Sequence, residues 1–129
     1  SAMTSLIIED SLIDASLITS ALEARGYGDL KVFERAEDAL DYIRSDAAKP
    51  DFCLVDSRLP GMSGSDFIKL EKKCGKMDGV PCISLSTSNL KDEIRIALEA
   101  GADGYFVKPS DLEEYERVIA RIIEAHLSA

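Results

Sequence analysis

The chain has 129 residues, 46% of them hydrophobic and 30% charged, a composition typical of one globular domain with a substantial core. Its net charge is −9 and it has no basic run, which argues against direct nucleic-acid binding, and no apolar stretch reaches the length of a membrane span. The three cysteines form neither a CxxC pair nor an even disulfide set, which indicates a reducing compartment, the cytoplasm. Ser1 and Ala2 ahead of Met3 are interpreted as a cloning scar, and residues 4–129 as one domain.

Five segments have the character of short strands. A continuously apolar run predicts a strand that is covered on both faces, as in a parallel sheet. The segment DLKVFE at 29–34 is weaker because it mixes Lys31 with Val32 and Phe33, and this composition favours an edge strand. The four stronger segments are SLIIED at 5–10, DFCLVDS at 51–57, PCISLSTS at 81–88 and GYFVKP at 104–109.

Apolar residues at helical spacing fill the gaps between these strands. Gly26 is expected to end the first helix, and Ser110 with Glu113 predicts a capping box at the start of the last. Strict alternation of strand and helix predicts an α/β sandwich with right-handed crossovers. The expected packing positions are Ala15, Ile18 and Leu22; Ala36, Ala39, Leu40 and Ile43; Phe67, Leu70 and Cys74; Leu90, Ile94, Ala97, Leu98 and Gly101; and Leu112, Tyr115, Val118, Ile119, Ile122 and Ile123.

Polar side chains stand where the central strands end. Glu9 and Asp10 close the first strand, Asp56 the third, Ser86 the fourth and Lys108 the fifth. In open α/β sheets, ligands bind beyond the carboxyl ends of the strands. We therefore expect these side chains to converge on one rim of the sheet.

The residue types in this set favour phosphoryl chemistry. A carboxylate at the end of a buried strand, such as Asp56, is costly unless it is paired, hydrogen-bonded or bound to a metal. Neighbouring carboxylates repel one another, and Mg²⁺, which prefers one or two carboxylates with waters and a phosphate oxygen, relieves that repulsion. Lys108 supplies a charge for a phosphoryl group, and the Ser86 hydroxyl a hydrogen bond. Asp56 can then act as a nucleophile and form an aspartyl phosphate.

This pattern resembles the receiver domain of two-component response regulators over the chain from Thr4 onward. The resemblance implies a flavodoxin-like (βα)5 sandwich with a five-stranded parallel sheet in the order 2-1-3-4-5, and it makes the weak second strand an edge strand. The residues that carry it are Glu9-Asp10, Asp56 followed by Leu59-Pro60-Gly61-Met62, Ser86-Thr87, and Gly101-Ala102 with Tyr105 and Lys108-Pro109.

The resemblance also implies roles for these residues. Asp56 would be the phosphoacceptor and Asp10 a direct Mg²⁺ ligand, with Glu9 acting largely through water and the backbone carbonyl of Arg58 completing the protein ligands. Lys108 would pair with the phosphoryl group or, in its absence, with Asp56. Ser86 and Tyr105 would form the switch pair. The Lys108–Pro109 peptide bond would be cis, an uncommon state for X–Pro bonds in folded proteins.

The expected partners are a sensor histidine kinase or a histidine phosphotransfer protein, together with an unidentified output partner. A second apolar arc on the first helix, formed by Ile13, Leu17, Ala21 and Ala24, is expected to pack on the fifth helix. Part of it, with Leu12 near the site, is an alternative docking surface for the phosphodonor, and packing and docking can share the arc. The surface formed by the fourth helix, fifth strand and fifth helix is expected to be solvated, and its use as a dimer interface is an open alternative.

Other functions compete with this one. A receiver that is not phosphorylated would act only as a protein-interaction module. An aspartate-nucleophile phosphohydrolase would need a second aspartate two residues after Asp56, where Arg58 stands. The expected activity is therefore that of a signalling switch and not of an enzyme, apart from self-catalysed phosphorylation and dephosphorylation. His126, the only histidine, is expected to be a solvated surface residue.

Overall fold

A computed structural model of the chain describes residues 3–45 and 48–127, so Ser1 and Ala2, interpreted above as a cloning scar, lie outside the described residues. Strands and helices alternate along the chain, and a short π-helical turn, η1 (Ile123–Leu127), follows the last helix. The elements are β1 (Thr4–Ile8), α1 (Leu12–Glu23), β2 (Asp29–Phe33), α2 (Ala36–Arg44), β3 (Phe52–Asp56), α3 (Gly64–Cys74), β4 (Cys82–Ser86), α4 (Lys91–Ala100), β5 (Gly104–Val107) and α5 (Leu112–Ile122).

The five strands form one sheet in the order β2-β1-β3-β4-β5, and all four neighbouring pairs are parallel. This confirms the expected flavodoxin-like topology, including the place of β2 at an edge. Every residue of β3 and β4 is buried, whereas β2 has only half-buried and exposed positions. The continuously apolar runs thus occupy the centre of the sheet, where both faces are covered.

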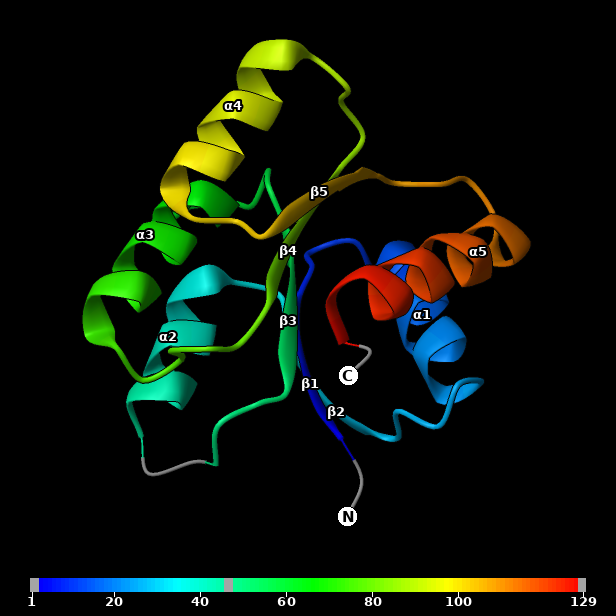
Figure 1. Ribbon diagram of the computed structural model, residues 1–129, viewed down its shortest axis with the longest axis horizontal. Coiled ribbons are helices and arrows are strands. Elements are labelled where there is room, and N and C mark those ends of the chain that lie inside the picture. The colour runs from blue at the N-terminus through cyan, green and yellow to red at the C-terminus, as the bar shows by residue number, and fades with distance from the viewer. Residues whose placement is uncertain (1–2, 46–47, 128–129) are drawn as a thin grey trace.

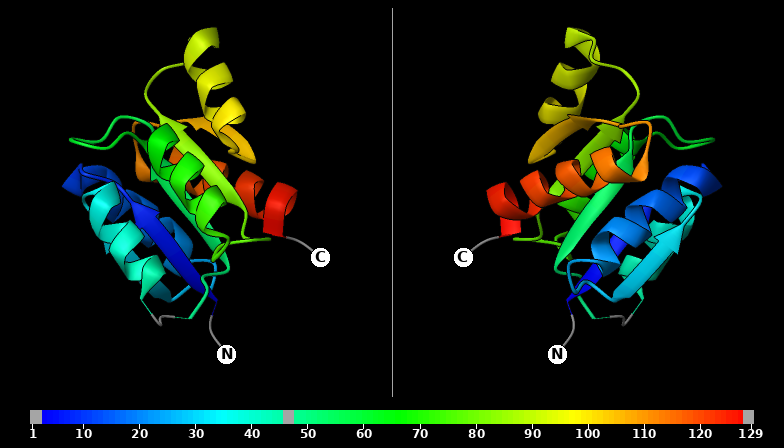
Figure 2. Two further views of the ribbon diagram at one scale, coloured as in Figure 1. Left: turned by 90° about the vertical axis from the view of Figure 1, so that its left-hand side faces the viewer. Right: turned by 90° about the vertical axis from the view of Figure 1, so that its right-hand side faces the viewer.

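Helices cover both faces of the sheet (Figure 1), with α1 and α5 on one side and α2, α3 and α4 on the other, as the two side views also show (Figure 2). Alternate residues of a strand enter different cores because successive side chains point to opposite faces. In β1, Leu6 and Ile8 join the core beneath α2, α3 and α4, whereas Ile7 joins the core beneath α1 and α5. Cys53 and Cys82 lie opposite each other in β3 and β4 and are fully buried, and both are free thiols.

Some predicted details of the helices are wrong. In α4 the buried residues are Ala97 and Ala100, while Leu98 is exposed because it follows Ala97 by one position and so points about 100° away from the packed face. Leu90 is the N-cap of α4 and is exposed as well. His126 is half-buried and packs edge-to-face against Phe106, so it is not simply a solvated residue.

Of the two predicted helix ends, one is wrong and one is confirmed. Asp111, and not Ser110, caps α5, because the helix begins at Leu112 and Asp111 Oδ1 accepts a hydrogen bond from the Glu114 amide at 2.9 Å. The prediction that Gly26 ends α1 is confirmed. Its φ is 87°, its amide donates to the Glu23 carbonyl at 3.0 Å, and the Tyr27 amide donates to the Leu22 carbonyl at 3.0 Å, which are the two hydrogen bonds of a Schellman ending with a left-handed glycine. Among the described residues, no helix has the length and apolarity that crossing a membrane requires.

Candidate functional site

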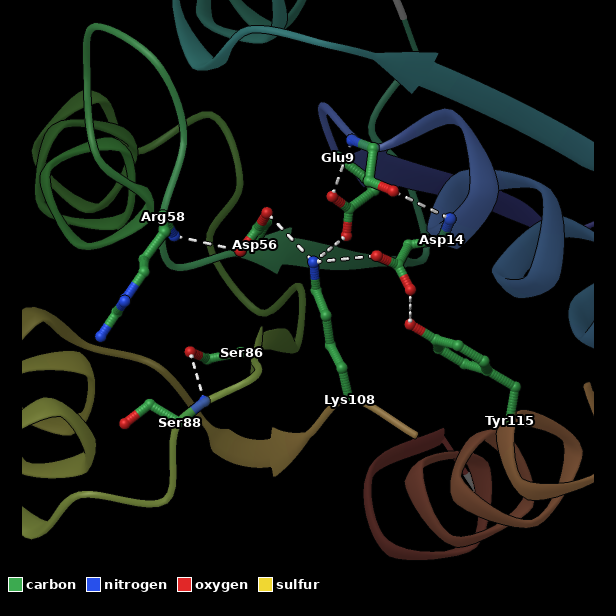
Figure 3. Close-up of polar contacts among 9 residues, drawn as sticks. Glu9, Asp14, Asp56, Arg58, Ser86, Ser88, Lys108 and Tyr115 are labelled. Atoms are coloured by element: carbon green, nitrogen blue, oxygen red, sulfur yellow. Dashed lines mark hydrogen bonds and ion pairs between the residues drawn. The ribbon is translucent and has the colours of Figure 1, made fainter. Parts of the chain in front are cut away.

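Three carboxylates meet at the carboxyl edge of the sheet, and Figure 3 shows two of them, Glu9 and Asp56. Glu9 and Asp10 directly follow β1 and Asp56 ends β3, and these strands pair in parallel, so their ends lie side by side. Carboxylate oxygens of Glu9, Asp10 and Asp56 all lie within 4.8 Å of one another. Glu9 and Asp56 are only 2% and 6% exposed, whereas Asp10 is exposed to solvent. The predicted convergence of these side chains is thereby confirmed.

Lys108 enters the same cluster from the end of β5. Its backbone amide donates to the carbonyl of Ser86 at 2.7 Å, which ties it to the end of β4. Its Nζ atom lies 2.7 Å from Glu9 Oε1 and 3.1 Å from Asp56 Oδ2, and the side chain is only 7% exposed. One buried ammonium therefore neutralises part of a cluster of negative charge.

The electrostatics of the site follow from burial and from these contacts. Burial, and to a smaller extent the charge of Asp56, raises the pKa of Glu9 to about 7, against the hydrogen bonds from Lys108 and from the Ser11 amide, which lower it. Burial alone would lower the pKa of Lys108, but its hydrogen bonds and charge interactions with Glu9 and Asp56 outweigh burial and raise it. Lys108 is thus a permanent cation, and the carboxylates around it retain uncompensated negative charge.

A divalent cation fits this donor set. The three carboxylates offer hard oxygen ligands within reach of one ion, which is the ligand type that Mg²⁺ and similar ions prefer. A bound divalent ion would also favour the ionised form of Glu9, which burial disfavours. The acidic cluster is therefore a candidate metal site.

The loop after Asp56 holds that carboxylate in place. The Arg58 amide donates to Asp56 Oδ1 at 3.0 Å, so each oxygen of Asp56 has its own partner. Gly64, the first residue of α3, passes so close behind the loop that a Cβ atom there would overlap the carbonyl of Asp56. The Arg58 side chain turns away from Asp56 and forms an ion pair with Glu93 of α4.

The loop after β4 connects the two residues expected to form a switch. The Ser86 hydroxyl accepts a hydrogen bond from the Ser88 amide at 3.2 Å, and the half-buried Tyr105 donates its hydroxyl to the Ser88 carbonyl at 2.6 Å. Ser88 thus joins both side chains through its own backbone. Neither Ser86 nor Tyr105 makes a hydrogen bond to Asp56 within the described part of the chain.

One expectation drawn from the resemblance is wrong. None of the peptide bonds in the described residues is cis, so the Lys108–Pro109 bond is trans. The trans isomer is the intrinsically favoured state of an X–Pro bond, and Lys108 reaches the carboxylates with the bond in this state.

Sequence reasoning missed two residues of the site, Asp14 and Tyr115. Asp14 Oδ2 lies 3.6 Å from Lys108 Nζ, and Asp14 Oδ1 accepts a hydrogen bond from the Tyr115 hydroxyl at 2.7 Å. One signal pointed to this contact, because a tyrosine in a buried stripe needs a partner for its hydroxyl.

An α/β sandwich with an acidic cluster and a lysine at the carboxyl edge of its sheet defines the class of protein, and comparisons with known proteins give the family. The sequence profile of the response regulator receiver domain matches residues 5–120. The chain therefore belongs to the response regulator receiver domain family.

Similar proteins include a regulatory protein and a response regulator. The chain is 30% identical to a probable methanogenesis regulatory protein, FilR2, of Methanothrix harundinacea, over 92% of this chain and 80% of FilR2. It is 32% identical to the DNA-binding response regulator MtrA of Mycobacterium leprae over 91% of its length, and it spans about half of MtrA (50%).

Solved structures share the fold. The phosphorylated cyanobacterial phytochrome response regulator RcpA superposes with a TM-score of 0.89 at 25% identity, covering 99% of this chain and 96% of RcpA. The Mn²⁺-bound form of response regulator Rcp1 gives a TM-score of 0.83 at 20% identity, covering 95% of this chain and 92% of Rcp1. The similarity to Rcp1 is evidence for the fold alone.

Proposed function

We propose that this chain is a phosphoacceptor receiver domain of a two-component phosphorelay, in which Asp56 accepts a phosphoryl group from a phosphohistidine donor. The observation that carries the proposal is the contact of 3.1 Å between Lys108 Nζ and the buried Asp56 carboxylate beside Glu9 and Asp10. A cation is thus already in place where a transferred phosphoryl group would bring negative charge. The fold shared with RcpA, whose structure is of the phosphorylated protein, supports the same conclusion.

The metal in this proposal is Mg²⁺. Asp10 and Asp56 would hold it directly, Glu9 largely through water, and the backbone carbonyl of Arg58 would complete the protein ligands. When bound, the ion supplies positive charge that offsets the charge on the phosphoryl oxygens. Its proposed ligands offer only oxygen atoms, which suits a hard cation.

The chemical step is a displacement at phosphorus. A carboxylate oxygen of Asp56 attacks the phosphorus atom, an O–P bond forms, and the N–P bond of the donor breaks with its electron pair going to the imidazole nitrogen. Lys108 and the Ser86 hydroxyl hold phosphoryl oxygens, and the Arg58 amide keeps Asp56 oriented through its hydrogen bond to Oδ1. Attack by water on the phosphoryl group later releases inorganic phosphate and restores Asp56. The chain thus catalyses only its own modification, in keeping with a signalling module.

The switch would act through the loop that carries Ser88. If the Ser86 hydroxyl turns to a phosphoryl oxygen, it gives up its bond to the Ser88 amide, and Tyr105, bonded to the Ser88 carbonyl, is freed to move with the loop. The Arg58–Glu93 ion pair connects the loop after Asp56 to α4 as well. Phosphorylation then selects a surface that binds the output partner better.

Two exposed apolar surfaces suit the expected partners. Leu12 and Ile13, at 73% and 75% exposure, lie in the first turn of α1 just after Glu9 and Asp10, where a histidine kinase or a phosphotransfer protein would approach Asp56. Leu90, Leu98 and Val107 are exposed on α4 and β5, where an output partner or a second copy of the chain would bind. The absence of disulfides among the three cysteines is consistent with a cytoplasmic setting.

The proposal is tested with acetyl phosphate and Mg²⁺. We expect the intact mass of the wild type to rise by one phosphoryl group and that of Asp56→Asn to stay unchanged, with no modification of the wild type when the metal is chelated. An unmodified wild type in the presence of both reagents would contradict the proposal. Partner binding that is identical with and without the phosphodonor would instead support a protein-interaction module.

A further inference from the structure

Asp14 of α1 contacts both Tyr115 of α5 and the site residue Lys108 (Figure 3). The Tyr115 hydroxyl donates to Asp14 Oδ1 at 2.7 Å, and the other oxygen, Asp14 Oδ2, lies 3.6 Å from Lys108 Nζ. The two oxygens of one carboxylate therefore face two different partners, a hydroxyl on α5 and an ammonium at the end of β5.

Asp14 is held firmly in this position. Tyr115 is fully buried, and burial followed by the hydrogen bond to Asp14 raises its pKa, so its hydroxyl remains a protonated donor. On the other side, the backbone amide of Asp14 donates to the Ser11 hydroxyl at 3.2 Å. Side chain and backbone are both tied, which leaves Asp14 Oδ2 in a defined place beside Lys108.

The three carboxylates around Lys108 differ in their relation to the metal cluster. Glu9 and Asp56 belong to the group that can hold an ion, whereas Asp14 does not belong to any such group in the described residues. A divalent cation that faces Glu9 and Asp56 neutralises part of their negative charge, and this weakens their attraction for Lys108. Asp14 makes the longest of the three contacts, but it is the one that metal binding leaves intact.

We propose that Asp14, held by Tyr115, is a positioning residue that keeps the Lys108 ammonium beside Asp56 while Glu9 and Asp56 serve the metal. This inference rests on the proposed function of the site. Without the charge of Asp14, Lys108 pairs with Glu9 and Asp56 alone in the metal-free protein. In the metal-bound protein it then loses its remaining fixed partner, and its ammonium group becomes mobile.

An acidic residue in the first turn of a helix also has a plain structural explanation, since it favours the helix dipole. Asp66 is a matched control for Asp14, because it lies three residues after the N-cap serine of α3 as Asp14 does in α1. Its amide donates to the Ser63 hydroxyl at 3.1 Å, as that of Asp14 does to Ser11. Asp66 is exposed and makes no ion pair with the other described residues. Asp66→Asn therefore removes a charge from a helix start without touching Lys108.

The experiment compares the whole chain as wild type, Asp14→Asn, Tyr115→Phe and Asp66→Asn. Asparagine keeps the shape of Asp14 and an oxygen that can accept the Tyr115 hydrogen bond, so it removes only the charge. Phosphorylation by acetyl phosphate in Mg²⁺ is followed by intact mass. The order of the Lys108 ammonium is followed by NMR of the lysine Nζ groups with and without Mg²⁺, with Lys108→Arg identifying the signal.

We expect Asp14→Asn to be phosphorylated roughly tenfold more slowly than the wild type, because a misplaced catalytic group costs rate steeply. Tyr115→Phe should be slower by about threefold, as expected for the loss of one hydrogen bond. In Asp14→Asn the Lys108 signal should broaden on addition of Mg²⁺, which a merely structural role of Asp14 does not predict. Asp66→Asn should match the wild type in both measurements.

Three results would overturn the inference, and they are distinguishable. If the wild type is phosphorylated and Asp14→Asn behaves like it in rate and in the Lys108 signal, the inference alone fails. If the wild type neither binds Mg²⁺ nor accepts phosphate, the proposed function fails and the inference fails with it. Equal defects in Asp14→Asn and Asp66→Asn would assign the effect to the helix start and would also overturn it.

Discussion

Glu9, after β1, and Glu71, in α3, are both at most 2% exposed, and burial raises the pKa of each to about 7. Their surroundings differ. Glu9 has Lys108 at 2.7 Å and two carboxylates nearby, whereas neither carboxylate oxygen of Glu71 has a hydrogen-bond partner within the described residues, and Lys72 Nζ lies 4.0 Å away. A shifted pKa therefore marks burial, and only the convergence of further charged groups marks a site.

Removal of the Lys108 ammonium should have the largest effect, because Glu9 would then be buried without a close cation, as Glu71 is. Lys108→Met leaves buried carboxylates without a cation, so we expect the free energy of unfolding at pH 7.5 without metal to fall by about 3 to 5 kcal/mol. Urea denaturation measures the loss. The control is Lys31→Met, which removes an exposed lysine of β2 that pairs only with Asp29 among the described residues. A loss no larger than in this control would show that Glu9 is not stabilised by Lys108.

The second prediction concerns Glu71 and pH. Burial raises its pKa from 4.5 to about 7, Lys72 opposes this, and the charges of Asp103 and Asp78 add to it. Between these two values Glu71 binds more protons in the folded state than in the unfolded state. Its contribution to stability is therefore greatest at low pH and is lost as the pH rises through 7. At about 1.36 kcal/mol per pH unit, the loss attributable to Glu71 is up to roughly 3 kcal/mol by pH 8.

Glu71→Gln keeps the shape of the side chain and removes this titration. The difference in unfolding free energy between variant and wild type should therefore favour the variant increasingly from pH 5 to pH 8. Glu116→Gln, an exposed glutamate of α5, serves as the control and should show no such trend. If the unfolding free energies of wild type and Glu71→Gln change with pH in the same way, the charged form of Glu71 is not buried.

The third and smallest effect separates the two glutamates directly. At ten times its dissociation constant, Mg²⁺ should stabilise the wild type by about 1.4 kcal/mol, because it binds only the folded state. Calorimetric melting should show the same increment in Glu71→Gln and most of it lost in Glu9→Gln. An equal increment in Glu9→Gln would show that Glu9 takes no part in metal binding.

The sequence predicted the parts of this molecule that depend on position along strands. Asp56 and Lys108 could be placed on one rim because parallel strands present their carboxyl ends together. The predicted face of α3, marked by Phe67, Leu70 and Cys74, was rotated from the buried face, which contains Phe67, Ile68 and Glu71. Apolar spacing cannot identify a buried face that includes a glutamate.

The missed parts of the site depend on contacts between elements far apart in the chain. Asp14 and Tyr115 are 101 residues apart and meet because α1 packs on α5. Asp14 alone is explained by its place at a helix start, and Tyr115 alone by its place in an apolar stripe. Similarly, Arg58 lies 35 residues from Glu93, and nothing in the local sequence pairs them.

The facing thiols in the middle of the sheet give the protein a built-in reporter of its own opening. Cys53 and Cys82 have no exposed surface, and the hydrogen bond to Cys82, together with burial, raises the pKa of Cys53. A thiol-labelling reagent can reach them only when the core beneath α2, α3 and α4 opens, whereas the half-buried Cys74 of α3 supplies an internal reference in the same molecule. Labelling rates of these native cysteines thus measure how often the core around the centre of the sheet opens, without any introduced cysteine.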